Sequence, residues 1–428
     1  MRFAKTKISG RRRTGQGSLN VGYAATIDCA VLIAAQELGL FRQHGLDVRL
    51  SREVGWTTIR EKLLHEELDA AATHASMLFS IYCGIGVVRR PCLSGLLLGR
   101  NGSAITLAKA FWDEGVRDAA TLGRWIQDQR GRRSFTFGVV QELSSQNLNL
   151  RKWLRSGGID PDRDVRVVVI PSALMFEMLR SGHLDGYCVA EPWNSAAIMD
   201  GCGWTVAATS EVEPDHPEKV LLVLREFAEK HEAEHLCMLA ALIAASQFCA
   251  RLENRPELAR MLAQPCYFNV DKKLLTNSLV GPFESGHGRR SIKDFVLYDA
   301  LQAGVPTRAT GKWVFDLVRG LGGNDRNPAL RSEIIPKIFR EDLFAKALRL
   351  ALPAPGDGPA FFLNDGNPKA GLKPDAQPVT LPSLSAPSAP ENPLTHLPPF
   401  VPPSPNHPPE MSTALCELTR FNPTQPAP

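Results

Sequence analysis

The stretch DGYCVAEPWNSAAI, residues 185–198, ends an apolar run on a charged and aromatic turn. Its apolar part, residues 187–190, predicts a buried strand, and a helix-like run follows it. Between the two stand Glu191, Pro192 and Trp193, where a core strand normally ends on small polar residues. A strand whose carboxyl end lines a cleft can use a carboxylate, a rigid turn and a large aromatic ring. We therefore expect a ligand cleft at this strand end.

On either side of this stretch, short apolar strands alternate with amphipathic helices. The expected strands are 19–25, 45–53, 68–75, 134–140, 164–170 and 184–190. The expected helices are 30–41, 57–64, 145–156 and 172–181. Strands separated by helices of this length predict βαβ units and parallel sheets. Because the units form two series, 19–105 and 134–210, we predict an α/β fold of two lobes, followed by a mostly helical region.

Both ends of the chain differ from this body. Residues 1–18 are basic and predict a disordered N-terminus. About twenty of the 32 prolines fall in 353–428, which predicts a proline-rich disordered tail without the apolar mass to form a core. The folded part is therefore expected at 19–352.

The composition favours a cytoplasmic globular protein. The net charge of +4 is spread over 428 residues without a basic, aromatic-rich stripe, so no direct contact with nucleic acid is expected. No apolar segment of about 7–15 residues follows the basic N-terminus, and no run reaches about 18 apolar residues. Neither export nor a membrane span is therefore expected. The nine cysteines are scattered and odd in number, so we expect neither disulfides nor a metal site.

The chain lacks the common catalytic motifs, including Walker A, GxSxG, HExxH and GxGxxG. We therefore predict neither an enzyme nor a cofactor. Helix starts at 55–58 and 143–147 carry hydroxyl groups, and the N–H groups of helix N-termini suit small anions. Lys219 precedes an apolar run and is a further candidate to face an anion. Singly, these features are also typical of ordinary helix caps and a solvated lysine.

Several segments, in the right order between about residues 19 and 363, resemble one known family. The chain resembles the nitrate/bicarbonate-binding solute receptors of ABC importers, and within them most resembles the cytoplasmic nitrate/nitrite sensors (NasS type). The segments are DCAVLIAAQELGLFRQHGLDVRL, GWTTIREKL, LNLRKWLRSGGIDPDRDVRVVVIP, DGYCVAEPWNSAAI and DHPEKVLLV. The resemblance implies a two-lobed periplasmic-binding-protein type II fold with an interlobe ligand cleft. We expect lobe 1 at about 19–120 plus 220–352, and lobe 2 at about 121–219.

The resemblance also implies which residues bind the ligand. The family's pocket tryptophan and lysine fall on Trp56 and Lys219. Two positions depart from the family, because Ser103 replaces a common Gln or Asn and Gln146 replaces a His. Both side chains can still hydrogen-bond an oxyanion, but Gln146 cannot carry a positive charge. The predicted ligand-binding residues are completed by two from the strand end and one from the helix start: Glu191, Trp193 and Asn147.

A cytoplasmic nitrate/nitrite sensor is the function that the resemblance and the N-terminus favour together. Its small ligand is nitrate or nitrite, and its implied protein partner is an RNA-binding antiterminator regulator (ANTAR type, NasT-like). The alternative is the substrate-binding component of an ABC importer for nitrate, nitrite or bicarbonate. An enzyme acting on a small anion is a third reading, for which no residues are positioned.

Overall fold

The computed structural model describes residues 17–322 and 327–351. The predicted disordered N-terminus, apart from residues 17 and 18, and the predicted proline-rich tail lie outside these residues. All described residues belong to one compact unit.

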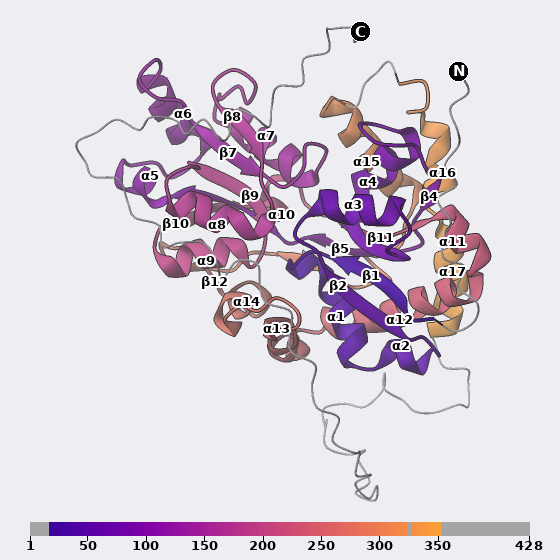
Figure 1. Cartoon of the computed structure of the whole chain (residues 1–428). Coiled ribbons are helices and arrows are strands. Elements are labelled where there is room, and N and C mark those ends of the chain that lie inside the picture. Colours follow the sequence, from indigo (N-terminus) through magenta and orange to yellow (C-terminus); the bar gives the residue numbers. More distant parts are fainter. Residues whose placement is uncertain (1–16, 323–326, 352–428) are drawn as a thin grey trace, which may run out of the picture. The chain divides into compact units, whose positions relative to one another are not determined.

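The first sheet contains seven strands drawn from both ends of the described chain. They are β1 (Leu19–Tyr23), β2 (Val48–Arg52), β3 (Ala70–His74), β4 (Cys92–Leu93), β5 (Leu97–Asn101), β11 (Pro217–Leu224) and β14 (Val296–Leu297). Their order is β14-β5-β11-β3-β1-β2, and β4 pairs with β11 (Figure 1). Strands β1, β2 and β3 are parallel, as the βαβ pattern predicts, whereas β11 runs antiparallel to β3 and β5.

The second sheet contains five strands, all from the middle of the chain. They are β6 (Ser103–Ala108), β7 (Thr136–Val139), β8 (Arg166–Val169), β9 (Gly186–Ala190) and β10 (Gly203–Ala208). Their order is β10-β6-β9-β7-β8. Strand β7 is parallel to β8 and β9, whereas β6 is antiparallel to β9 and β10. A small hairpin of β12 (Phe283–Glu284) and β13 (Arg289–Arg290) forms a third sheet.

Helices and short 3-10 turns connect these strands. Before β6 come η1 (Ile27–Cys29), α1 (Ala30–Glu37), α2 (Leu40–Gln43), α3 (Trp56–Leu64) and α4 (Ala75–Cys83). Between β6 and β11 come α5 (Lys109–Asp113), α6 (Ala119–Asp128), α7 (Ser145–Ser156), α8 (Ser172–Arg180), α9 (Trp193–Asp200) and α10 (Thr209–Val212). After β11 come α11 (Arg225–Lys230), α12 (Glu232–Ala250), η2 (Leu252–Asn254), α13 (Arg255–Ala263), α14 (Lys272–Leu279), α15 (Arg308–Gly320), η3 (Ser332–Ile334), α16 (Ile335–Ile338) and α17 (Glu341–Ala351).

The chain passes from the first sheet to the second at Asn101 and Gly102. Their φ angles are +60° and +87°, a left-handed conformation that Asn and Gly adopt most readily. We call residues 103–212 the second lobe, and the first sheet with its helices the first lobe. The second sheet therefore begins earlier than the predicted boundary at about 120, whereas β11 of the first sheet begins at Pro217, close to the predicted boundary at about 219. No helix separates β5 from β6, so the βαβ pattern could not predict that the chain passes between the sheets at Gly102.

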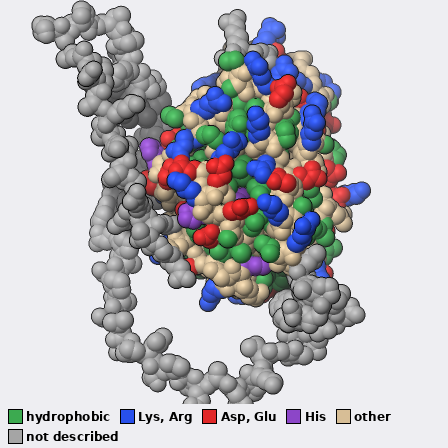
Figure 2. All heavy atoms as spheres, turned by 90° about the vertical axis from the view of Figure 1, so that its right-hand side faces the viewer, with side chains coloured by type: hydrophobic (Ala, Val, Ile, Leu, Met, Phe, Trp, Pro, Cys, Tyr) green, Lys and Arg blue, Asp and Glu red, His purple; other side chains and the backbone are tan. Residues whose placement is uncertain are grey.

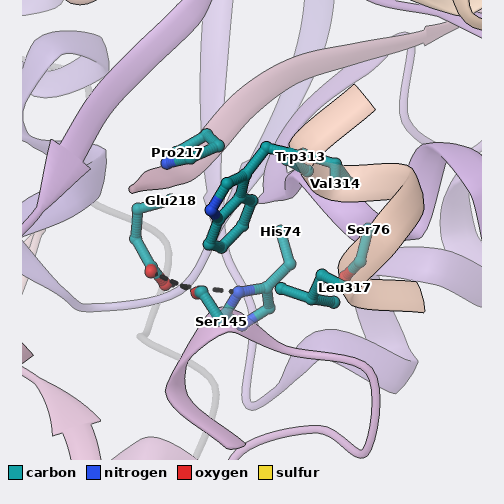
Figure 3. A pocket seen from close by; sticks show the side chains of 9 residues that line it. His74, Ser76, Ser145, Pro217, Glu218, Trp313, Val314 and Leu317 are labelled. Carbon is teal, nitrogen blue, oxygen red and sulfur yellow. Dashed lines mark hydrogen bonds and ion pairs between the residues drawn. The ribbon is translucent and has the colours of Figure 1, made fainter. Parts of the chain in front are cut away.

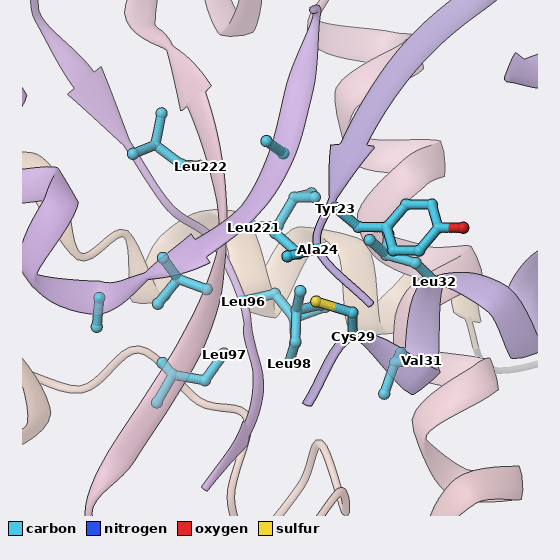
Figure 4. Packing of buried hydrophobic residues seen from close by; sticks show 14 of the residues in the cluster. Tyr23, Ala24, Cys29, Val31, Leu32, Leu96, Leu97, Leu98, Leu221 and Leu222 are labelled. Carbon is cyan, nitrogen blue, oxygen red and sulfur yellow. The ribbon is translucent and has the colours of Figure 1, made fainter. Parts of the chain in front are cut away.

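The core of the first lobe is built around β11, whose eight residues are all buried. An apolar run such as VLLVL is typical of a strand with neighbours on both sides. In Figure 4 its Leu221 and Leu222 lie among residues of β1, η1, α1 and the segment around β5. Helix α12 is apolar all round, and it packs against α1 and α17 as a core helix.

In the described part of the chain, α12 is the one helix long and apolar enough to cross a membrane. More than half of its most apolar window, 56%, is buried. The same length and composition are found in core helices of globular proteins, which is the role its packing gives it here.

Charge on the surface is mixed. In Figure 2, Lys and Arg side chains lie interspersed with Asp and Glu over one face, rather than forming a basic stripe. Many of these charges pair within a single helix, as Lys312 does with Asp316. The eight cysteines among the described residues are all free thiols.

Candidate functional site

Lys219 is the centre of a buried cluster of charges in the first lobe. It is the third residue of β11 and is fully buried. Its Nζ lies 2.5 Å from Asp28 Oδ2 and 2.8 Å from Glu218 Oε1. Burial by itself lowers the pKa of Lys219, but the Asp28 and Glu218 carboxylates outweigh it and raise the pKa above its ordinary value. The lysine is therefore held in its charged form.

Asp28 is positioned by the end of β1. The chain leaves this strand through Thr26, whose hydroxyl donates a 2.5 Å hydrogen bond to Asp28 Oδ1. This bond leaves Oδ2 free to face Lys219. His74, the last residue of β3, lies at the same edge of the sheet because the carboxyl ends of parallel strands meet there.

An aromatic pair covers the lysine. Trp56 opens α3 directly after β2, and its ring centroid lies 4.4 Å from that of His74. Lys219 Nζ is 4.7 Å from the Trp56 ring, within the range of a cation–π interaction. Burial, together with the charge of Lys219, lowers the pKa of His74 below its usual value. The imidazole therefore stays neutral at physiological pH.

Glu218 receives contacts from both lobes. From the first lobe, Lys219 is joined by His74 Nδ1 and His216 Nε2, each 3.4 Å from a carboxylate oxygen. Burial by itself raises the pKa of Glu218, but the charge of Lys219 and the two nearby histidines hold it well below its usual range. Glu218 is thus a fully buried, ionised carboxylate.

The second lobe contributes the first residues of α7. Ser144 caps this twelve-residue helix by accepting a hydrogen bond from the backbone N–H of Asn147, as its sequence predicts. Ser145 Oγ then donates a short hydrogen bond to Glu218, and Gln146 Nε2 donates to Glu218 Oε1 at 3.1 Å. Figure 3 shows Glu218, Ser145 and His74 turned toward one another beside Trp313. The small cavity among these side chains leaves no volume for a water molecule.

Several polar atoms around this cluster lack hydrogen-bond partners. Buried polar atoms are paired in the great majority of cases, so each exception requires an explanation. Six exceptions gather here. Asp28 Oδ2 and His216 Nε2 each face a charged side chain, and the other four are Trp56 Nε1, His74 Nε2, Ser76 Oγ and Gln146 Oε1. Donors and acceptors left unpaired at one interlobe position are what a small polar ligand requires.

Four of the seven predicted ligand-binding residues belong to this cluster. Trp56 and Lys219 are in contact, and Gln146 Nε2 donates to Ser103 Oγ at 3.0 Å as well as to Glu218. The side chain of Asn147 turns back instead, donating to the carbonyl of Glu142 at 2.6 Å. Asn147 therefore supports the start of α7.

The other two predicted residues lie where the lobes meet. Trp193 Nε1 donates to the carbonyl of Ala25 at 3.1 Å, and the carbonyl of Glu191 accepts from the N–H of Ile27 at 2.9 Å. The Glu191 side chain is fully buried and accepts from the N–H of Ser195 at the start of α9. Among the described residues, no hydrogen bond or ion pair joins either side chain to the Lys219 cluster. The turn that follows the strand thus fastens one lobe to the other.

Sequence reasoning missed five members of the cluster: Asp28, His74, Ser145, His216 and Glu218. Asp28 and His74 stand alone in apolar segments, and only the sheet brings them together. Glu218 carried a signal, because it forms a charged pair with Lys219 at the start of a buried strand. Charged residues are almost never fully buried unless they are paired.

The fold is the two-lobed fold of the periplasmic-binding-protein class, and the cluster lies where its two lobes meet. Residues 13–263 match the NMT1-like family, and the chain belongs to that family. The solved structure of the periplasmic nitrate-binding protein NrtA from Synechocystis PCC 6803 shares this fold. It superposes with a TM-score of 0.73 at 24% identity, covering 78% of this chain and 88% of that one.

The curated relatives of this chain are named as nitrate or bicarbonate transport and binding proteins. The chain is 34% identical to the nitrate import ATP-binding protein NrtC of Synechocystis over 78% of its own length and 50% of that protein. It is also 34% identical to the bicarbonate transport ATP-binding protein CmpC of the same organism, over 82% and 52%. The chain thus spans about half the length of these relatives. The nitrate/nitrite binding protein NrtA of Nostoc is 26% identical over 79% of this chain and 78% of that protein.

Proposed function

We propose that this protein is a receptor for a small oxyanion of the nitrate, nitrite or bicarbonate class, and that it acts by binding rather than by catalysis. The observation that carries the proposal is Lys219, fully buried beneath Trp56 at a place where both lobes supply hydrogen-bond donors. An ammonium group, an indole N–H and an amide are suited to the oxygens of such an anion. The names of the relatives support this choice of ligands.

Titration of the purified protein with nitrate, nitrite and bicarbonate tests this proposal. At least one of the three is expected to bind and to change the tryptophan fluorescence, because Trp56 lies against Lys219. The change should disappear in Trp56→Phe but persist in Trp125→Phe, whose ring packs against Phe111 in the second lobe. Binding of none of the three anions, by fluorescence or by calorimetry, would refute the proposal.

We propose that the protein's role is that of the receptor of an ABC importer, because the relatives are named as import and transport proteins. The cytoplasmic sensor stays a prediction, and so does its antiterminator partner. The importer receptor and the sensor differ in whether ligand binding changes the affinity for a regulator protein. A sensor requires ligand and regulator to change each other's affinity by the same factor, typically about 5- to 150-fold.

Partner binding separates these roles. If the protein is an importer receptor, affinity-tagged protein should bind the permease encoded beside it and show no ligand-dependent binding to a co-encoded antiterminator. Antiterminator binding that weakens at least about fivefold under saturating nitrate or nitrite would place the sensor first instead. Cell fractionation of the full-length protein tests the predicted cytoplasmic location independently.

A further inference from the structure

The Glu218 carboxylate occupies the position that suits the anion. Four donors converge on it, Lys219 Nζ, His74 Nδ1, Ser145 Oγ and Gln146 Nε2. His216 Nε2 lies 3.4 Å away, while Nδ1 of the same ring donates to the carbonyl of Glu213. They come from β3, β11 and the segment before it, and from α7 of the second lobe. An ammonium group and an imidazole from the first lobe, with a hydroxyl and an amide from the second, are also the donors that would surround a bound oxyanion. The protein's own carboxylate therefore holds the place of a ligand.

The charges of this cluster do not favour a second anion. Two carboxylates, Asp28 and Glu218, face one ammonium group, so these three side chains carry a net charge of −1. All three are at most 1% exposed, so water screens them poorly. A monoanion placed beside them would bring the local charge to −2 in a buried site. Like charges that share such a site do not both stay ionised, and one group takes up a proton.

Glu218 is the group that the geometry selects for that proton. Asp28 Oδ2 lies 2.5 Å from Lys219, and Asp28 Oδ1 accepts from Thr26, so this carboxylate has fixed partners within the first lobe. Two of the hydrogen bonds that Glu218 accepts come instead from Ser145 and Gln146 of α7, in the other lobe, and both bonds would be lost if the lobes separated. The titratable and charged groups that face Glu218 are His74, His216, Lys219, Asp28 and Cys188.

We propose that Glu218 sets the proton stoichiometry of ligand binding, so that nitrate or nitrite enters this site together with one proton. The inference rests on the proposed oxyanion-binding function. The proton comes from solvent and resides on a Glu218 carboxylate oxygen, and no covalent bond changes. Bicarbonate differs, because it brings a proton of its own, and its oxygen and the Glu218 carboxylate share this proton in one hydrogen bond. It therefore binds without proton uptake, and Glu218 discriminates between oxyanions that carry hydrogen and those that only accept hydrogen bonds.

Calorimetry in buffers of different ionisation enthalpy measures the protons taken up on binding. For nitrate or nitrite, the wild-type protein should take up about one proton per anion between pH 6 and 8. The affinity should then fall about tenfold for each unit of rising pH. In Glu218→Gln the uptake should vanish, and nitrate should bind more tightly than to wild type at pH 8. The matched control is Glu333→Gln, an exposed residue of η3, which should behave as wild type.

The outcomes separate this inference from the proposed function. Nitrate or nitrite binding to wild type without proton uptake would overturn the inference and leave the oxyanion receptor standing, and this measurement needs no variant. Bicarbonate binding without uptake, weakened by Glu218→Gln, supports the inference. Binding of nitrate to Glu218→Gln but not to wild type at pH 8 also supports it. Failure of every anion to bind either protein would refute the receptor itself, and the inference with it.

Discussion

Replacing Lys219 with methionine is expected to destabilise the folded protein by about 3–5 kcal/mol at pH 7. Methionine fills much of the same space, but it leaves Asp28 and Glu218 buried without their shared counter-charge. Removing one partner of a buried ion pair typically has a cost of this size, because the remaining charge stays desolvated. Urea unfolding of both proteins gives the difference. The control is Lys230→Met, whose ammonium pairs with Glu226 on the surface and should change stability little.

The dependence on pH gives this prediction a second test. Lys219 depresses the folded-state pKa of Glu218 below its ordinary value of 4.5. A depressed carboxyl pKa stabilises the folded state above the unfolded pKa, and this contribution is lost as pH falls. The difference between wild type and Lys219→Met should therefore be largest above about pH 5 and shrink at lower pH. A difference no larger than that of Lys230→Met would contradict the ion-pair arrangement described here.

Replacing Glu191 with glutamine is expected to stabilise the protein by about 3 kcal/mol at pH 8. Burial raises the pKa of Glu191 from 4.5 to about 7, more than hydrogen bonds from Ser195 and Asn194 lower it. Its Oε1 has no hydrogen-bond partner, and glutamine keeps the shape of the side chain without the charge. The buried charge that forms at alkaline pH is thereby removed.

The sign of this effect is opposite to that at Glu218. Because the folded-state pKa of Glu191 is raised, its stabilising contribution is complete below about pH 4.5 and is lost as pH rises through 7. The advantage of Glu191→Gln should therefore grow between about pH 5 and 8 and disappear in acid. Glu253→Gln, an exposed substitution in η2, serves as the control. Equal unfolding midpoints for Glu191→Gln and wild type at pH 8 would show that Glu191 is not a buried titrating group.

The sequence predicts the parallel parts of this fold well and the antiparallel parts poorly. Helix α7 begins and ends where the pattern predicts, and β1, β3 and β9 lie within their predicted ranges. Strands β6 and β10 were missed because each pairs with an antiparallel neighbour and needs no crossover helix. Hydrophobic periodicity identifies an element, but it does not say which neighbour completes the sheet.

The residues of the site were also predicted only in part from the sequence. Lys219 and Trp56 were found through resemblance, and Gln146 and Ser103 joined them even though both depart from the family. Asp28 and His74 could not be found, because their partners are about 145 to 190 residues away in the chain and sequence alone does not measure that proximity. Glu191 and Trp193 were assigned to the ligand because a strand end suits a cleft. Their described contacts join the lobes, and their contact with a ligand stays a prediction.

The order of strands in the first sheet has a consequence for synthesis on the ribosome. Among the described residues, β5 pairs only with β11 and β14, and one edge of β3 pairs only with β11. Both strands therefore find these partners only after the whole second lobe has been synthesised. A nascent chain that ends before Pro217 therefore exposes unpaired strand edges, which are sites of aggregation. The second lobe is one continuous segment, and the five strands of its sheet all come before Pro217 in the chain. The second sheet can therefore form before the first, because the first sheet requires β11, which leaves the ribosome later.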